Sequence, residues 1–274
     1  MDRIDLPRKA NTIRKSVVKM VARGGGGHIG SALSIVDIVT VLYFGVLKVD
    51  PSKPDWKERD RFVLSKGHGC VALYAALAHR GFFPVDLLDT FYQDGTTLLG
   101  HPELQKVPGL ECSSGSLGHG LSIGVGFSLA AKADHLSYRT FVLLGDGECD
   151  EGSVWEAAMS AGHFRLDNLV AIVDYNKIQA TGPTSEVMSL EPLAAKWRAF
   201  GWAVREVDGN DAGKVLSALS RVPFRAGKPS VLIAHTIKGK GVSFMENQVI
   251  WHYRTPDLGQ EASALKELEG QMGW

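Results

Sequence analysis

The chain has 274 residues, of which 45% are hydrophobic and 22% are charged, as in ordinary globular proteins. Lys plus Arg and Asp plus Glu each number 30, so the formal net charge is zero and there is no general excess of cations to bind nucleic acid. The longest apolar stretch, 34–49, contains Asp37 and is too short to span a bilayer, and the charged amino terminus does not resemble a signal peptide. We therefore expect neither nucleic acid nor a membrane as a partner.

The three cysteines indicate a reducing compartment. Cys70, Cys112 and Cys149 are widely spaced and form no C-x-x-C pair, which argues against a zinc site or a redox motif. An odd number of dispersed thiols is typical of reduced cysteines, so we expect a cytoplasmic protein.

Helical and strand-like patterns alternate along the chain. Near the amino terminus Ile13, Val17 and Val21 recur at helical spacing. Ser34, followed by Asp37, then resembles an N-cap before a long apolar helix. Five short apolar runs predict buried strands at 61–64, 140–144, 169–174, 203–207 and 230–235. Further helices are expected at 71–79, 123–133, 154–164, 192–200 and 211–222.

This alternation predicts an α/β fold. Runs rich in Val, Ile and Leu without strict alternation are typical of parallel strands that are covered on both faces. We therefore expect a doubly wound, mainly parallel sheet with right-handed crossovers. It would form a single domain over 1–274, with a carboxy-terminal arm from about 242 that ends in a helix near 261–268. In such folds ligands bind beyond the carboxyl ends of the strands.

Two polar loops follow successive predicted strands. Gly145-Asp146-Gly147 comes after one strand and Asn176 after the next, 30 positions later, which is the length of one strand–helix–strand unit. Adjacent parallel strands would bring a carboxylate and an amide oxygen together, and such ligands suit Mg²⁺ or Ca²⁺ with phosphate oxygens. The glycines would let the backbone approach a phosphate, toward which the helix that starts near Ser153 would point its amino end. Gly-Asp-Gly alone also occurs in ordinary turns, but the second loop at this spacing favours a metal site.

Several histidines lie in glycine-rich loops. They are His28, His68, His101 and His119, and His252 adds a fifth between two aromatic residues. Loop histidines can donate to phosphate and sugar hydroxyl groups, and they titrate near neutral pH. The remaining histidines are interpreted as structural or exposed; these are His79, His135, His163 and His235.

Together these motifs resemble the transketolase family. Asp146 and Asn176 at this spacing are similar to the thiamine-diphosphate motif, which begins Gly-Asp-Gly and ends in Asn. The family also has Gly-His-Pro-Gly, Gly-His-Gly, Gly-His-Pro and Gly-Pro-Leu-Gly-Gln-Gly segments in a fixed order. Matching segments occur here in the same order, at 27–30, 67–69, 100–102 and 115–120, and the resemblance extends from about residue 10 to residue 256.

The resemblance implies a role for each matched position. Asp146, Asn176 and the backbone of Ile178 would bind Mg²⁺ or Ca²⁺ beside thiamine diphosphate. His28 and His101 would face the reacting carbons of the sugar and bond its hydroxyl and oxyanion groups. The other cofactor-binding positions would be Gly145, Gly147, His68 and His252 at the diphosphate, and Gly115 and Leu117 at the aminopyrimidine.

Some positions depart from the family pattern or allow two interpretations. Ile29 replaces the family's proline, and His119 stands where the family usually has glutamine, so the role of His119 stays open. Glu151 and Glu156 resemble family glutamates at the subunit interface. They equally suit carboxylates at a helix start that the helix dipole favours.

The implied activity is transfer of a two-carbon ketol group from a ketose phosphate to an aldose phosphate. In this family the glutamate that activates the cofactor, and arginines that bind the sugar phosphate, belong to a separate pyrimidine-binding domain. The sequence stops before such a domain, so we expect the N-terminal subunit of a split transketolase or a truncated form of a longer one. The charged start and helical end favour the subunit.

The subunit would act only with a C-terminal subunit that carries the pyrimidine-binding domain, in an α2β2 assembly. The apolar run 35–49 and the helix 154–164 would supply part of the interface.

Two alternatives remain open at this point. One is the alpha subunit of a 2-oxo acid dehydrogenase, which shares the cofactor motif but not the histidine loops. The other is a non-catalytic cofactor-binding subunit, which the presence of both the metal pair and the two sugar-facing histidines argues against. The sugars themselves are not determined, and pentose phosphates, branched sugar phosphates and sulfonated sugars all fit.

Overall fold

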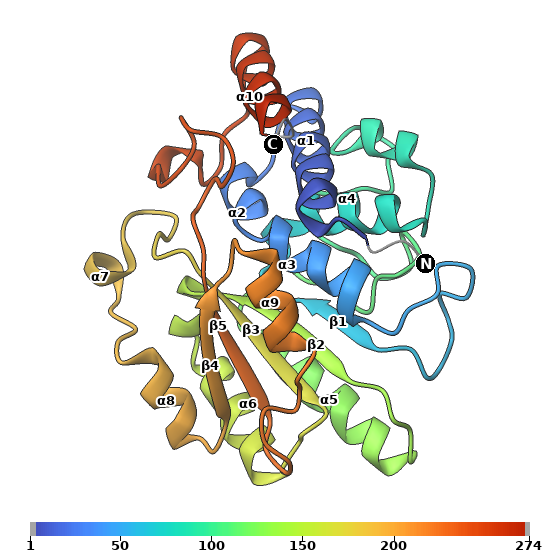
Figure 1. Ribbon diagram of the computed structural model, residues 1–274, viewed down its shortest axis with the longest axis vertical. Coiled ribbons are helices and arrows are strands. Elements are labelled where there is room, and N and C mark those ends of the chain that lie inside the picture. Colours follow the sequence, from blue (N-terminus) through green and yellow to red (C-terminus); the bar gives the residue numbers. More distant parts are fainter. Residues whose placement is uncertain (1–3, 272–274) are drawn as a thin grey trace.

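The computed structural model of the chain describes residues 4–271, which form a five-stranded sheet with helices on both faces (Figure 1). All neighbouring strands are parallel, and their order across the sheet is β1-β2-β3-β5-β4. The predicted α/β fold with a doubly wound parallel sheet is therefore confirmed. The strands are β1 (Arg61–Leu64), β2 (Thr140–Gly145), β3 (Leu169–Tyr175), β4 (Ala203–Asp208) and β5 (Ser230–His235).

The central strands are buried on both faces because their side chains alternate between two apolar cores. In β3, Val170 and Ile172 belong to one core, whereas Leu169, Ala171 and Val173 belong to the other. An uninterrupted apolar run therefore suits this strand, since neither face meets water. Only the edge strand β4 is partly exposed along its length.

One face of the sheet is covered by the amino-terminal helices and by α9, with α10 packed against α1 further out (Figure 1). The stripe of Ile13, Val17 and Val21 on α1 is fully buried, as its helical spacing predicts. The side chain of Asp5 caps this helix by accepting a hydrogen bond from the Arg8 backbone N–H. The elements on this face are α1 (Leu6–Gly24), α2 (Ile29–Ser34), α3 (Val36–Val41), the π-helical turn η1 (Leu42–Val46), α4 (Cys70–Arg80), α9 (Ala212–Leu219) and α10 (Leu258–Gly270).

The opposite face carries α5, α6 and α8. Helix α5 lies very close to β2, because a Cβ atom added at Gly124 would stand 2.5 Å from Cγ2 of Val142. The helices are α5 (His119–Ala133), α6 (Gly152–His163) and α8 (Leu193–Ala199). The remaining short elements are α7 (Thr184–Val187) and the 3-10 turns η2 (Gly67–Gly69), η3 (Val85–Thr90), η4 (Gly147–Asp150) and η5 (Val249–Trp251).

The apolar run after Ser34 differs from its prediction. Ser34 is not a helix N-cap; it is the last residue of α2, and its hydroxyl donates to the Ser31 carbonyl and to the Asp174 carboxylate. The helix expected after Ser34 is divided into α3 and η1, and its residues from Ile35 to Tyr43 are buried inside this chain. That part of the run cannot supply a subunit interface, because the core of its own domain already covers it.

The segment expected as a carboxy-terminal arm packs back on the domain. Val242, Met245 and Trp251 are buried in the first core, and Ala264 and Leu268 of α10 join them. The last helix begins with a capping box, since Asp257 and Gln260 each bond the other's backbone N–H. Packing against α1 thus fixes the loop between β5 and α10, which carries His252, to the rest of the fold.

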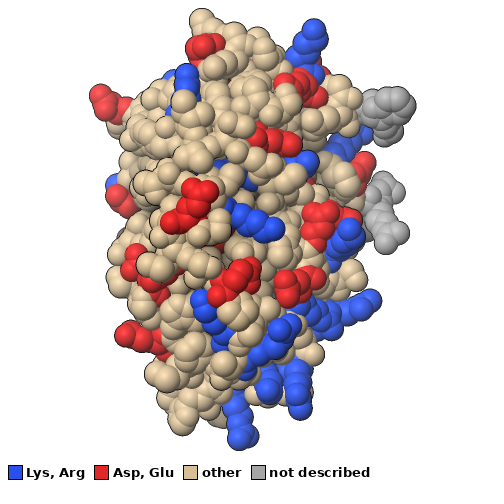
Figure 2. Space-filling view, turned by 90° about the vertical axis from the view of Figure 1, so that its left-hand side faces the viewer, with Lys and Arg blue, Asp and Glu red and all other residues tan. Residues whose placement is uncertain are grey.

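Charge is unevenly distributed over the surface although the net charge is zero. Figure 2 shows Lys and Arg side chains gathered at the lower end of the molecule, where the strands begin. Exposed cations in the segments before β2, β3 and β5 include Lys132, Arg165, Arg221 and Arg225. Among residues 4–271 no helix is long and apolar enough to cross a membrane.

Candidate active site

The two polar loops meet at the carboxyl ends of β2 and β3. Gly145 pairs with Asp174 across these strands, and the backbone N–H of Asp146 donates to the Asp174 carbonyl at 3.2 Å. The neighbouring strand tips predicted from the sequence spacing are therefore confirmed. The Asp146 carboxylate accepts backbone hydrogen bonds from Gly147 and Lys177, and the Asn176 amide oxygen accepts one from Ile178.

A cavity of about 350 Å³ opens beside these loops. Every position that the resemblance implied for catalysis or cofactor binding lines it, namely His28, His68, His101, Gly115, Leu117, Gly145, Asp146, Gly147, Asn176, Ile178 and His252. The sequence did not single out six further lining residues, which are Ser31, Lys66, Glu148, Gln179, Ala180 and Lys238. The fold thus brings loops from the whole length of the chain to one cavity.

Four of the histidines form a cluster in this cavity. The ring of His28 lies 5.0 Å from that of His68, 5.3 Å from that of His252 and 6.1 Å from that of His101, measured between centroids. Burial, and then the charges of His101 and nearby lysines, lower the pKa of His28 to about 4. Burial likewise lowers the pKa of His252 to about 3 and that of His68 well below its ordinary value. These three rings are neutral near pH 7, so each has one nitrogen that donates and one that accepts.

Two buried lysines also line the cavity. Lys66 pairs with the buried carboxylate of Asp174 at 2.5 Å and also donates to the Ser31 carbonyl. The Nζ of Lys238 donates to the Ile178 carbonyl at 2.8 Å and lies 2.8 Å from Nδ1 of His252. Burial, followed by the charge of Lys66, lowers the pKa of Lys238 to about 8. Both lysines adjoin glycines in loops that follow strands, and that pattern is the sequence signal that would have found them.

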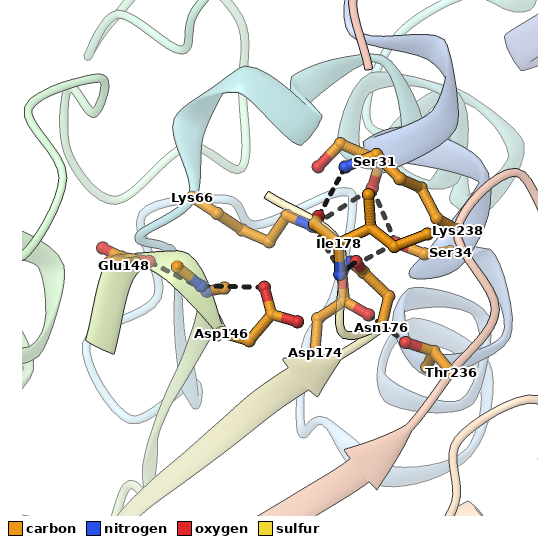
Figure 3. A network of polar contacts seen from close by, with 12 residues as sticks. Ser31, Ser34, Lys66, Asp146, Glu148, Asp174, Asn176, Ile178, Thr236 and Lys238 are labelled. Carbon is orange, nitrogen blue, oxygen red and sulfur yellow. Dashed lines mark hydrogen bonds and ion pairs between the residues drawn. The ribbon is translucent and has the colours of Figure 1, made fainter. Parts of the chain in front are cut away.

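Asp174 anchors the polar network beneath the cavity (Figure 3). Burial alone would raise its pKa, but the Lys66 ammonium and hydrogen bonds from Lys66, Thr236 and Ser34 outweigh burial, so the pKa of Asp174 is lowered. Its Oδ2 also accepts a hydrogen bond from the Asn176 amide at 3.0 Å. This bond orients the amide so that its oxygen faces away from Asp174, a position from which it could bind a cation.

Glu148 ties three loops together on the other side of the cavity. Its carboxylate accepts hydrogen bonds from the Ser65 hydroxyl and from the backbone N–H groups of Gly118 and Gly145. Burial raises the pKa of Glu148 despite these bonds. The carboxylate thus accepts hydrogen bonds from backbone N–H groups in turns that have no backbone acceptor for them. It thereby fixes the position of the Gly145–Gly147 turn at the ligand site.

The amino end of α6 does not reach the cavity, contrary to the sequence-based prediction. The 3-10 turn η4 intervenes between β2 and α6, and the cavity lining stops at Glu148 in this part of the chain. Glu151, the N-cap residue of α6, Glu156 within α6 and His119 at the start of α5 are exposed and line no part of the cavity.

The residues at the strand tips fit a divalent cation that a phosphate helps to hold. The available ligands are the Asp146 carboxylate, the Asn176 amide oxygen and the Ile178 carbonyl, all of them hard oxygen atoms. Over residues 4–271 no three His, Cys, Asp or Glu side chains converge as a metal site. Burial, and then the charge of Asp174, raise the pKa of Asp146 to about 6, a cost that an adjacent cation would offset.

The glycines around the cavity fit a cofactor that approaches the backbone. A Cβ atom added at Gly145 would lie in ordinary contact, 3.8 Å from the side chains of Glu148 and Lys66 that line the cavity. Gly115 has a φ of +152°, and an added Cβ would stand 3.2 Å from the ring of His101. A side chain at either position would therefore reduce the room for a ligand or displace a histidine.

Sequence comparisons assign the family. The family described as the thiamine diphosphate binding domain of transketolase matches residues 7–274. This chain belongs to the transketolase family. It is 48% identical to the 6-deoxy-6-sulfo-D-fructose transketolase subunit SqwG of Clostridium sp. (strain MSTE9), over 97% of this chain and 98% of that protein. It is 47% identical to an apulose-4-phosphate transketolase subunit of Phocaeicola vulgatus, over 93% of this chain and 90% of that protein.

Solved transketolases share the fold. The transketolase of Leishmania mexicana superposes with a TM-score of 0.86 at 31% identity, over 97% of this chain. A Pichia stipitis transketolase in complex with sedoheptulose 7-phosphate superposes with a TM-score of 0.88 at 33% identity, over 98% of this chain. The chain spans less than half of these proteins, 45% and 41% respectively. A transketolase assignment is thus supported, and the alternative of a 2-oxo acid dehydrogenase subunit is not favoured.

Proposed function

We propose that this chain is the thiamine-diphosphate-binding subunit of a two-chain transketolase, which acts in the cytoplasm with a partner that carries the pyrimidine-binding domain. The observation that carries the proposal is the convergence of all eleven matched positions on one cavity. Relatives of matching length that are named transketolase subunits support the need for a partner. The three free cysteines are consistent with a reducing compartment.

The strand tips of β2 and β3 are suited to hold Mg²⁺ or Ca²⁺ together with the cofactor's diphosphate. Asp146, Asn176 and the Ile178 carbonyl would bind the cation, and Lys66 and His68 would face the phosphate oxygens. A cation at the Ile178 carbonyl would repel the Lys238 ammonium, which donates to that same oxygen here. Lys238 would then turn from Ile178 toward the added negative charge.

Thiamine diphosphate, when bound, supplies the nucleophilic carbon and the electron sink that ketol transfer needs. This chain supplies binding, orientation and proton transfer. His28 and His101 stand on two different loops, with 6.1 Å between their ring centroids. Neutral His28 can donate to an oxygen that gains negative charge or accept a proton from a hydroxyl group, and His101 is placed to bond a neighbouring oxygen.

The proposed substrates are a ketose donor and an aldose acceptor that carry an anionic group. The relatives are named for 6-deoxy-6-sulfo-D-fructose and for apulose 4-phosphate, one a sulfonate and the other a phosphate. The proposal covers both classes as well as ordinary pentose phosphates. A panel of these ketoses, assayed with one common aldose acceptor, would rank them by kcat/KM.

The decisive experiment combines this chain with a pyrimidine-domain chain, Mg²⁺ and thiamine diphosphate. We expect ketol transfer from the mixture and none from either chain alone. Decarboxylation of a 2-oxo acid without transfer to an aldose would contradict the proposal. Full transfer by this chain alone would contradict it as well, because the partner would then have no catalytic role.

A further inference from the structure

One tyrosine beside the histidine loops has a strained backbone. Tyr92 has a φ of +61°, in the left-handed region that a bulky side chain rarely adopts. Its ring lies between Gly26 and Gly100, and a Cβ atom added at either glycine would stand 2.6 Å from a ring carbon. Such strain persists only where the surrounding structure fixes it, and it is common at functional sites.

The two glycines place this ring between the catalytic loops. Gly26 stands two residues before His28, and Gly100 directly precedes His101. The ring of Tyr92 therefore separates the loop that carries His28 from the loop that carries His101. The glycine-rich sequence before His28 is explained in part by this close approach, since no other residue would fit against the ring.

A second tyrosine, Tyr253, lies beside Tyr92 and the loop that carries His28. Tyr253 packs edge-on against His28, with 4.7 Å between ring centroids. Its hydroxyl group is 3.2 Å from the position of a Cβ at Gly26, so it reaches the same place as the Tyr92 ring. The neighbouring Tyr92 hydroxyl group raises the pKa of Tyr253.

Both tyrosines remain accessible. Tyr92 is 46% exposed and Tyr253 is 53% exposed, and neither lines the cavity that the four histidines share. Tyr253 contacts His28 itself, and the Tyr92 ring contacts the glycines beside His28 and His101. A sugar whose reacting carbons lie at His28 and His101 would therefore have both rings close by.

We infer that Tyr92 and Tyr253 form a specificity wall, which contacts the part of the sugar beyond the two-carbon ketol unit. The inference rests on the proposed function. Aromatic rings present flat apolar area to the C–H groups of a sugar, and their hydroxyl groups can bond its hydroxyls. Neither ring carries charge, so the two tyrosines would contact the carbon chain and its hydroxyl groups. Other residues would bind the terminal anionic group.

The test compares a long and a short donor in the assembled holoenzyme. The long donor is a ketose phosphate, and the short donor is hydroxypyruvate, which carries the ketol unit and a carboxylate only. We expect Tyr253→Ala to lower the ratio of kcat/KM for the long donor to that for the short donor by about tenfold, the usual size of a lost contact in a specificity pocket. Tyr253→Phe keeps the ring and should keep most of this ratio. Leu258→Ala, which truncates an 86% exposed apolar side chain at the start of α10, is the control and should leave the ratio unchanged.

Three results would overturn the inference. An unchanged ratio in Tyr253→Ala would show that the ring does not contact the sugar. An equal loss with both donors would show that Tyr253 acts by positioning His28. Loss of the complex with the partner chain, measured by analytical ultracentrifugation, would make the pair a contact between chains. Absence of transfer by the wild-type complex from either donor would instead refute the proposed function, and this inference with it.

Discussion

At the scale of single residues, the site is a balance of buried charges. Lys66 and Asp174 neutralise each other beneath the cavity. Within residues 4–271, by contrast, Asp146 accepts only backbone hydrogen bonds and Lys238 has no carboxylate partner. A divalent cation and a diphosphate would supply the missing partners of both. The roles of the individual side chains can therefore be tested one at a time.

Asp146→Ala should abolish binding of thiamine diphosphate in the assembled enzyme, because the diphosphate would lose its bridging cation. Calorimetric titration with Mg²⁺ present measures this directly. Asp150→Ala is a matched control, since Asp150 is an exposed carboxylate in the same turn that lines no part of the cavity. Unchanged affinity in Asp146→Ala would mean that the motif has another role.

Binding and chemistry should separate between two histidines. His101→Ala should keep the cofactor but lower the rate of ketol transfer by about 10² to 10³, the usual effect of removing one donor to a developing charge. His68→Ala should mainly weaken cofactor binding, because its ring lies beside that of His252, which is also proposed for the diphosphate. Cofactor titration and steady-state kinetics on both variants would reveal the opposite pattern if these roles are reversed.

Acid should destabilise the cofactor-free chain partly through His28. Burial and neighbouring cations lower its pKa from 6.5 to about 4, so the unfolded state binds the proton first as the pH falls. The stability that neutral His28 contributes is complete above about pH 6.5 and is lost progressively toward about pH 4. His28→Gln should therefore show a smaller fall in Tm than the wild type between about pH 7 and about pH 5. The exposed His163→Gln is the control, and an identical pH dependence in His28→Gln and the wild type would argue against this account.

At the scale of elements, close packing of helices on the sheet fixes the loops of the site. Helix α5 follows the loop that carries Gly115 and Leu117, and it lies against β2, which leads directly to Asp146. Gly124 permits this contact because it has no side chain to separate the two elements. The position of one part of the cofactor site relative to another thus depends on a glycine outside the cavity.

Two glycines of α5 should respond in opposite ways to alanine. Gly124→Ala should destabilise the fold by about 1–3 kcal/mol, because the new methyl group would overlap Val142. Gly126→Ala, on the same helix, meets nothing within 4 Å and should stabilise the helix by up to about 1 kcal/mol. Urea unfolding of both variants measures the difference. Equal effects would mean that α5 can move away from β2 at no cost.

At the scale of the whole molecule, the cavity opens at the carboxyl ends of the strands, where a partner could cover it. Part of the surface expected for an interface is available, since Met159 and Phe164 at α6 are exposed. The other candidate, the run after Ser34, is largely committed to this chain's own core. We therefore place the expected self-association on the side of α6.

Mixing this chain with a pyrimidine-domain subunit should give an α2β2 complex with maximal activity at equal stoichiometry. Each site would then lie between two chains, so neither chain in excess can raise the activity further. Sedimentation and activity measured over a range of mixing ratios would test both statements. A complex with one copy of each chain and full activity would contradict the proposed symmetry.

The sequence by itself determined the strands of the fold and named candidate residues that line one cavity. The five strands were predicted within a residue of their observed ends. The buried strands are runs of mainly apolar residues, as parallel strands covered on both faces require, and the partly exposed β4 was recognised although it contains Arg205 and Glu206. His101 and His252 lie in longer irregular segments that only packing brings to the cavity, but His68, Asp146 and Asn176 lie in loops directly after strands. In a parallel sheet these loops converge at one edge whatever the details of packing.

Only the tertiary structure decided which polar groups pair beneath and around that site. Lys66 and Asp174 are 108 positions apart, and no local pattern marks them as partners. Ser34 looked like a helix cap because its own neighbours suggest one, yet its hydroxyl bonds Asp174, 140 positions away. Tyr92 and Tyr253 likewise meet only because two glycines leave room for a ring between two loops. The periodicity of apolar residues shows which face of a segment is buried, and it can be detected within that segment alone. The partner of a buried polar group, by contrast, is fixed only when distant segments pack together.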